Sequence, residues 1–300
     1  MFDELKTFIT EVDCKNFTKA AKKLNLSQPS VSPHIKNLEN YFNVTLINRS
    51  VKQKRIFITE SGHILYKRAK EMLNLLDITY IAVHDSTDTV KGHIKIGASL
   101  TIGECILPKF LSIFSKKYPD IDIEVVIENT ATISAEIKNL TLDIGLIEGS
   151  ISSSQLNQNF LLKDKMTLAC PYNPHLKEFD YDYLDNQKWL IREDGSGTRE
   201  YLNMFLFLHQ ITPKNVVVLG SNYAIKEAVK NGLGITIISK LVVDEAVKNK
   251  EITLLNLDNK FERYFSYITP KNITLSKASE IFISELKEYC KLEIDNLINS

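Results

Sequence analysis

A pair of closely joined helix patterns near the N-terminus constrains the fold more than any other feature of this 300-residue chain. In residues 27–42, Val31, Ile35 and Leu38 recur at helical spacing, so one apolar stripe faces a core. A shorter helix pattern at 17–24 comes just before and is separated from it by only two residues. Two helices joined this tightly are typical of a helix-turn-helix.

The outward face of the second helix begins with small polar residues and continues with a lysine. We expect Gln28, Ser30 and Ser32 to meet base edges in a major groove of DNA. Pro29 lies in the same turn, where a missing N–H costs little, and Lys36 would hold a phosphate one turn later. The ordinary alternative is an amphipathic helix with a good cap, and the neighbouring helix favours the DNA-binding interpretation.

Two short strand patterns, 45–47 and 55–59, follow the helices and enclose a basic segment at 49–54. A strand pair with a basic tip beside a helix-turn-helix predicts a wing that approaches a minor groove. The wing residues expected to hold phosphates are Arg49, Lys52 and Lys54.

Residues 60–85 carry an apolar stripe long enough for one continuous helix, with Leu65, Leu76 and Tyr80 among its members. Part of this stripe would pack against the wing domain. A second copy of the helix is the simplest partner for the rest, because proteins that read DNA half-sites are usually two-fold symmetric. The polar segment 85–89 is the expected hinge.

From residue 93 onward, strand and helix patterns alternate, which predicts α/β architecture. The first unit is βαβαβ, with a parallel sheet and helices on both faces, expected at 93–98, 102–117, 121–128, 134–140 and 142–147. A crossing loop at 150–160 leads to a second unit, expected at 166–170, 188–192, 198–208, 215–219, 223–230 and 235–238, before a late strand at 264–269 and a final helix at 276–296. Two lobes with the chain crossing between them imply a ligand cleft at their junction.

These patterns together resemble a known family of regulators. The chain contains the segments FTKAAKKLNLSQPSVSPHIKNLE, FNVTLINRS and ITESGHILYKRA, and with them it is similar to the DNA-binding end of LysR-type transcriptional regulators. The resemblance extends over nearly the whole sequence. Pro33 is a departure, because many relatives carry a basic or polar residue there, and it removes one helical hydrogen bond and one contact to DNA.

The resemblance implies a domain plan and a mechanism. The plan is a winged helix-turn-helix at 1–62, a linker and dimerisation helix with hinge at 63–92, and a two-lobed effector domain at 93–300 like periplasmic binding proteins, with lobe I at 93–161 plus 268–300 and lobe II at 162–267. The implied assembly is a homodimer that pairs into a homotetramer on double-stranded promoter DNA. Its DNA bending would change when an effector closes the cleft.

Three loops that run from strand ends into helix N-termini are suited to an anion, because free N–H groups and positive dipole ends meet there. By resemblance to the family, the residues that line the effector pocket are Ser99, Thr101, Asn129, Thr130, Ser196 and Thr198. The ordinary alternative for each of them is a plain helix cap. Convergence of the three loops on one cleft is what favours a site.

The effector expected from these residues is a small anion, either a sulfur oxyanion or a small carboxylate. The GSGTR segment at 195–199 resembles family members that govern sulfur assimilation or sulfite reduction. Arg192 and Arg199 are candidate partners for the anion, although Arg199 has Glu193 and Glu200 as alternative partners.

Composition argues against several other classes of protein. Residues 1–62 hold ten Lys or Arg and six Asp or Glu, a net +4, which leaves −4 on the remainder and suits a DNA-binding head. The four cysteines are widely spaced and the six histidines scattered, so neither a disulfide framework nor a metal site is expected. Without an apolar leader or a membrane-length run, we expect a cytoplasmic protein that is not an enzyme, needs no cofactor and has no membrane partner. The alternative is a cytosolic solute-binding protein that uses the same cleft without DNA.

Overall fold

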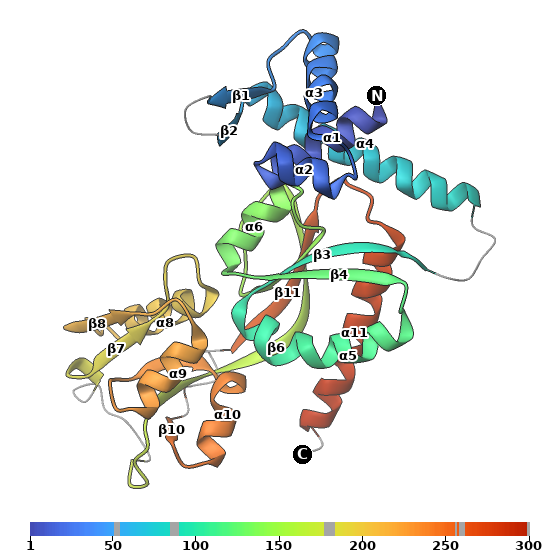
Figure 1. Cartoon of the computed structure of the whole chain (residues 1–300). Coiled ribbons are helices and arrows are strands. Elements are labelled where there is room, and N and C mark those ends of the chain that lie inside the picture. The colour runs from blue at the N-terminus through green and yellow to red at the C-terminus, as the bar shows by residue number, and fades with distance from the viewer. Residues whose placement is uncertain (51–54, 85–89, 177–183, 256, 258–261, 299–300) are drawn as a thin grey trace. The chain divides into compact units, whose positions relative to one another are not determined.

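The computed structural model describes residues 1–50, 55–84, 90–176, 184–255, 257 and 262–298. It separates into two compact units, Met1–Asp88 and Thr89–Ser300, which are described in turn (Figure 1).

The first unit is a helix-turn-helix followed by a strand pair and a long helix, as the sequence predicts. Its elements are α1 (Phe2–Cys14), α2 (Phe17–Lys23), α3 (Gln28–Phe42), β1 (Ile47–Ser50), β2 (Arg55–Ile58) and α4 (Glu60–His84). Strands β1 and β2 pair antiparallel. Strand β1 begins two residues later than expected, because the Glu39 carboxylate on α3 accepts the backbone N–H of Leu46 at 2.8 Å and of Ile47 at 3.3 Å. The wing therefore starts from a point tied to α3.

One small core holds this unit together. Leu5 and Phe8 of α1, Ile35 and Leu38 of α3, and Leu65 of α4 belong to it. The first turns of α4 thus pack on the helix-turn-helix itself. Phe42 continues the helical spacing of Leu38 and is predicted to extend the apolar stripe of α3, but it is 44% exposed, so the stripe ends earlier.

The second unit is a mixed α/β domain. Its elements are β3 (Gly92–Ala98), η1 (Ile102–Ile106), α5 (Leu107–Lys117), β4 (Ile121–Ile127), α6 (Thr130–Lys138), β5 (Ile144–Glu148), β6 (Leu156–Pro171), β7 (Lys188–Ile191), α8 (Gly197–Leu208), β8 (Asn215–Val218), α9 (Asn222–Lys230), β9 (Thr236–Ser239), α10 (Lys240–Lys248), β10 (Ile252–Leu255), β11 (Glu262–Pro270) and α11 (Lys277–Ile298). Helix α10 and strand β10 have no counterpart among the elements predicted from the sequence. The expected helix 102–117 begins as the π-helical turn η1, since Pro108 has no N–H to continue the ladder.

A seven-stranded sheet runs through the domain in the order β10-β6-β11-β5-β3-β4, with β9 also paired to β6. Strand β3 is parallel to β4 and β5, whereas β6 and β11 are antiparallel to each other. Strand β6 begins at Leu156, so the expected loop at 150–160 is wrong for its last five residues. Asn157 and Asn159 lie opposite Thr269 and Tyr267 of β11, and polar side chains on an exposed strand hide its two-residue period.

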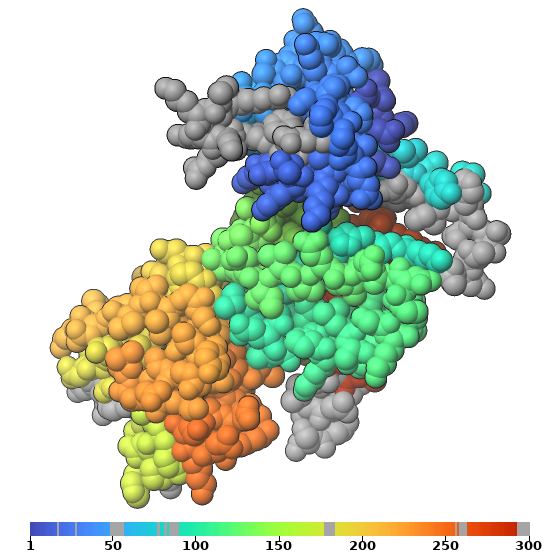
Figure 2. All heavy atoms as spheres, viewed as in Figure 1, coloured from blue at the N-terminus to red at the C-terminus, as the bar shows by residue number. Residues whose placement is uncertain are grey.

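Separate apolar cores define two lobes. In lobe I, α5 and α11 pack on one face of the sheet around Phe110, Phe114 and Phe282, and α6 packs on the other face. In lobe II, Trp189 and Phe205 are buried, and α9 and α10 cover the face of the lobe seen in Figure 2. The apolar cluster of Met204, Phe205 and Phe207 predicts that all three are core residues. This prediction is wrong for Met204 and Phe207, which face outward and are 37% and 82% exposed.

Candidate functional site

The leading turn of α3 presents the small polar face that the sequence predicts. Pro29 and Lys36 are exposed, and Ser30 and Ser32 are partly exposed. The Ser30 hydroxyl lies 2.6 Å from that of Ser27. Ser27 makes no side-chain cap, so α3 starts without the hydroxyl bond that the sequence suggests. The short side chains of this turn therefore lie at the surface of the first unit.

The remaining residues predicted to contact DNA lie in α3 and β1 or outside the described residues. Gln28 is the first residue of α3 and Arg49 lies on β1. Lys52 and Lys54 fall outside the described residues. Pro33 lies inside α3 without breaking it. The roles given to these residues stay predictions.

The second half of α4 carries the exposed part of the predicted dimer stripe. Leu75, Tyr80 and Val83 are 59%, 63% and 74% exposed in the single chain. Since Leu65 is 9% exposed, the stripe changes from core to surface along the helix. Its second half therefore presents apolar side chains at the surface of the single chain.

In the second unit, three of the predicted effector residues converge on one acidic residue, Glu148, at the end of β5. The Glu148 Oε1 accepts the backbone N–H of Thr101 at 2.8 Å, and Oε2 accepts the Thr198 hydroxyl at 3.0 Å. The Thr130 hydroxyl lies 3.4 Å from both the backbone oxygen and the backbone nitrogen of Glu148. Thr101 and Thr130 come from lobe I and Thr198 from lobe II, so the lobes meet at this carboxylate.

Arg263 of β11 binds both Glu148 and a second carboxylate, Asp164. Its Nη1 donates to Glu148 Oε2 at 2.7 Å, and its Nε donates to Asp164 Oδ2 of β6 at 2.6 Å. The Nη1 and Nη2 groups also reach the hydroxyls of Thr198 and Thr101, at 3.0 Å and 3.2 Å. Glu148, Asp164 and Arg263 are all buried. The two strands that pass between the lobes thus carry an ion pair, and Glu148 extends it into lobe I.

Burial and the neighbouring positive charge shift the pKa of the Glu148 carboxyl in opposite directions. Burial alone would raise the pKa of the Glu148 carboxyl, but the Arg263 guanidinium and the donors of Thr101 and Thr198 together lower that pKa below its ordinary value. The nearby carboxylates likewise raise the pKa of Arg263 against its burial. Both groups are therefore charged at neutral pH.

A second chain of hydrogen bonds crosses from lobe I to lobe II. Asn222 at the start of α9 donates to the Thr101 hydroxyl at 3.1 Å and accepts from Arg192 Nη1 at 2.6 Å. Arg192 also donates from Nη2 to Glu193 at 2.7 Å. Arg199 is paired with Asp194 at 3.2 Å, whereas the sequence analysis offered Glu193 or Glu200 as its partner.

Two of the predicted effector residues serve as helix caps. The Asn129 side chain accepts from the backbone N–H of Thr132, and the Ser196 side chain accepts from that of Arg199. Asn129 also donates to Glu193 Oε1 of lobe II at 3.4 Å. These two residues fit the ordinary alternative that the sequence left open, and Asn129 joins the lobes as well.

Two glycines of the GSGTR segment let the lobes approach closely. A Cβ on Gly195, which has φ +87°, would lie 2.8 Å from the Ala131 Cβ, and the Ala131 N–H donates to the Gly195 carbonyl. A Cβ on Gly197 would lie 2.4 Å from the Glu148 carbonyl oxygen. Glycine is therefore required at both positions for this contact.

Ser99 differs from the other predicted effector residues. It is 2% exposed, and its hydroxyl has no hydrogen-bond partner among the described residues. A buried hydroxyl without a partner is uncommon and marks a place where another group can bind.

Sequence reasoning missed Glu148, Asp164, Arg263 and Asn222. The available signal was a charged residue ending or interrupting an apolar strand pattern, as in GLIEG at 145–149. Spacing alone could not show that these residues meet, because Asp164 and Arg263 come together only through the register of β6 and β11.

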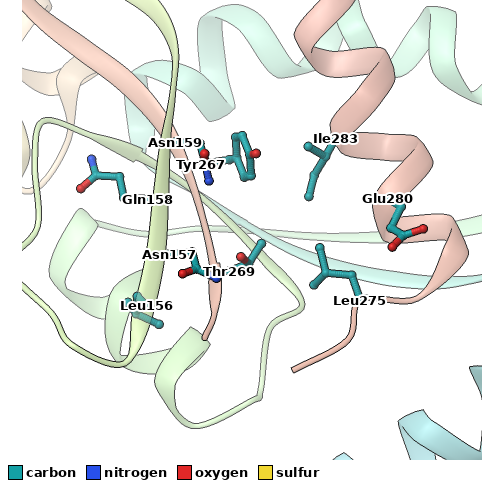
Figure 3. Close-up of a pocket in the computed structure, with 9 residues that line it drawn as sticks. All are labelled: Leu156, Asn157, Gln158, Asn159, Tyr267, Thr269, Leu275, Glu280 and Ile283. Atoms are coloured by element: carbon teal, nitrogen blue, oxygen red, sulfur yellow. The ribbon is translucent and has the colours of Figure 1, made fainter. Parts of the chain in front are cut away.

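A hollow lies on lobe I between β6, β11 and α11 (Figure 3). Its volume is about 520 Å³. Its lining residues are Leu156, Asn157, Gln158, Asn159, Tyr267, Thr269, Leu275, Glu280 and Ile283. The sequence analysis did not predict a site there.

The described residues contain neither a metal-binding cluster nor a membrane-spanning helix. No cluster of three or more His, Cys, Asp or Glu side chains is placed to hold a metal ion. Among the same residues, no helix combines the length and apolar character needed to span a bilayer.

Each of the two units of the structure matches a known protein family model. Residues 2–63 match the family model of the bacterial regulatory helix-turn-helix protein, lysR family, and residues 87–291 match that of the LysR substrate binding domain. The HTH-type transcriptional regulator CysL of Bacillus subtilis is 43% identical over 290 residues, which cover 95% of this chain and 96% of CysL.

Solved structures share the fold over almost the full length. Full-length OxyR from Pseudomonas aeruginosa has a TM-score of 0.79 at 18% identity, covering 96% of this chain and 94% of OxyR. Full-length CbnR complexed with its target DNA has a TM-score of 0.62 at 19% identity, covering 96% of this chain and 99% of CbnR. The chain therefore belongs to the LysR family of DNA-binding transcriptional regulators, with an N-terminal helix-turn-helix and a two-lobed effector-binding domain.

Proposed function

We propose that this regulator binds promoter DNA through the leading turn of α3 and the wing, and that a small anion bound between lobes I and II changes that binding. The observation that carries the proposal is the convergence of Thr101, Thr130 and Thr198 on one buried point where the two lobes meet. A ligand at such a point alters the closure of one lobe on the other.

At the DNA, different residues are proposed to contact the bases and the phosphates. Gln28, Ser30 and Ser32 would contact base edges with Pro29 beside them. The phosphate contacts would come from Lys36, Arg49, Lys52 and Lys54. Solved CbnR is complexed with its target DNA, which supports a DNA-bound form for a chain of this fold.

The proposed assembly is a homodimer through α4 that pairs into a homotetramer. The exposed Leu75, Tyr80 and Val83 supply the apolar face for the dimer. An extended helix with half of its stripe uncovered costs free energy in water, and a second copy buries that surface.

The proposed effector is a small anion, a sulfur oxyanion or a small carboxylate. It would act only through unequal affinity for the open and the closed arrangement of the lobes. Ser99, Thr101, Asn129, Thr130, Ser196 and Thr198 are the residues proposed to respond to it. The unpartnered Ser99 hydroxyl and the hydroxyls around Glu148 support this choice.

We also propose that the protein works in the cytoplasm, where promoter DNA lies, and catalyses no reaction of its own. The alternative, a solute-binding protein without a DNA target, is not favoured, because the chain carries a complete helix-turn-helix of the LysR family.

A gel mobility shift on the DNA upstream of the protein's own gene tests the proposal. We expect a complex whose mobility or affinity changes when a panel of small anions is added, and we expect Ser99→Ala to weaken that response without abolishing the complex. A complex that no anion alters would contradict the effector role, and the absence of any complex would contradict the regulator.

A further inference from the structure

The point where the two lobes meet already carries a negative charge of the protein itself. Glu148 and Asp164 contribute two negative charges and Arg263 one positive charge, so the buried group sums to −1 (−1 −1 +1). All three side chains are at most 2% exposed. Water therefore cannot screen this charge from a ligand.

Two nearby arginines are already paired with carboxylates of the loop that precedes α8. Arg192 is paired with Glu193 at 2.7 Å, and Arg199 with Asp194 at 3.2 Å. Each pair is neutral as a whole. An anion that enters beside Glu148 thus meets one net negative charge, and like charges brought together in a buried site repel strongly.

The donors of the site are also shared with Glu148. The Thr198 hydroxyl and the Thr101 N–H both point at its carboxylate. If an incoming oxyanion takes the Thr198 hydroxyl, Glu148 Oε2 loses a donor. A ligand with its own O–H restores that hydrogen bond, whereas a fully deprotonated oxyanion such as sulfate adds only acceptors.

We propose that Glu148 is the specificity-determining residue of the effector site, and that the effector is a singly charged oxyanion that still carries a hydroxyl or acidic hydrogen. Fully ionised oxyanions are disfavoured by charge repulsion and because they cannot replace the Thr198 hydrogen bond that Glu148 Oε2 would lose. This inference rests on the proposed anion effector and narrows its chemical class. The buried Ser99 hydroxyl, two residues before Thr101, is a further group without a partner among the described residues and available to such a ligand.

Inorganic phosphate and sulfate form a matched pair of probes, since both are tetrahedral and only phosphate keeps hydrogens in mildly acidic buffer. Isothermal titration of the full-length protein should show phosphate binding at least about tenfold more tightly than sulfate. In Glu148→Gln the negative charge is gone and the amide NH₂ is a new donor, so sulfate binding should rise by about tenfold or more and the preference should disappear.

Two further variants control the comparison. Glu148→Asp keeps the charge and should keep the preference for phosphate even if its stability falls. Glu280→Gln removes one charge from the lobe I hollow of Figure 3 and should leave the preference unchanged.

The outcomes separate this inference from the proposed function. Equal binding of phosphate and sulfate to the wild type, or a preference that survives in Glu148→Gln, overturns the role of Glu148 alone. If neither these probes nor the small-anion panel binds to the wild type, the anion effector itself is refuted and this inference falls with it.

Discussion

Arg263 and Glu148 form a buried ion pair, 2.7 Å between Nη1 and Oε2, that joins a strand passing between the lobes to the last residue of β5 in lobe I. The same guanidinium holds Asp164 at 2.6 Å. A single arginine therefore neutralises part of the charge of two buried carboxylates and sets the geometry where the lobes meet.

Replacing Arg263 should destabilise the effector domain severely. In Arg263→Met, Glu148 and Asp164 stay buried without their cation, and removing one member of a buried pair typically costs about 3–5 kcal/mol. Urea unfolding followed by circular dichroism measures this loss. The control is Lys248→Met, which breaks the exposed pair with Asp244 and should leave the unfolding midpoint unchanged. Similar midpoints for both variants would show that the buried pair is not important for stability.

The pH dependence of stability should report the charge of Glu148. Its pKa in the folded protein is lowered from the ordinary value of 4.5, so its stabilising contribution is complete above that value and is lost as the pH falls through the folded pKa. Thermal unfolding across acidic pH should therefore give a steeper decline for the wild type than for Glu148→Gln. Parallel profiles would contradict a charged Glu148 in the native state.

The exposed half of α4 should control assembly. Leu75→Asp places a charge on a surface that is 59% exposed in the single chain but buried in the proposed dimer. We expect sedimentation to shift toward monomer, with little change in the thermal stability of the chain. Tyr172→Asp, a similar change on lobe II, is the control, since Tyr172 is 44% exposed and lies outside α4. A dimer that withstands Leu75→Asp would place the interface elsewhere.

The fold could be predicted from the sequence where hydrophobic periodicity was strong. The α3 helix and the β3 strand appear within a residue or two of their expected bounds, because Ile35 and Ile96 each belong to a clear apolar pattern. The start of β6 could not be predicted, because Asn157 and Asn159 make a strand look like a loop. Its identity as a strand depends on pairing with β11, which lies about 100 residues away in the chain.

The candidate site could be predicted only in part, because some of its contacts also join positions that are distant in the chain. Helix N-termini after strands are visible in sequence and indicate three loops, and the resemblance to the family selects Thr101, Thr130 and Thr198 within them. The charged centre that these residues surround depends on contacts between positions as distant as Glu148 and Arg263. No local pattern encodes such a pairing, so the Glu148 carboxylate could not be predicted at a site expected to bind a small anion.

We propose that the N-terminal unit binds duplex DNA through charged and small polar side chains of α3 and the wing. Fluorescence anisotropy on DNA from upstream of the protein's own gene, repeated at increasing salt, is the measurement that tests this binding. We predict binding that weakens linearly with the logarithm of salt concentration, and a Lys36→Ala variant whose slope is reduced by about one while the slope of Lys240→Ala on lobe II is unchanged. Failure to bind at low salt, or identical slopes for the wild type and Lys36→Ala, would contradict the account.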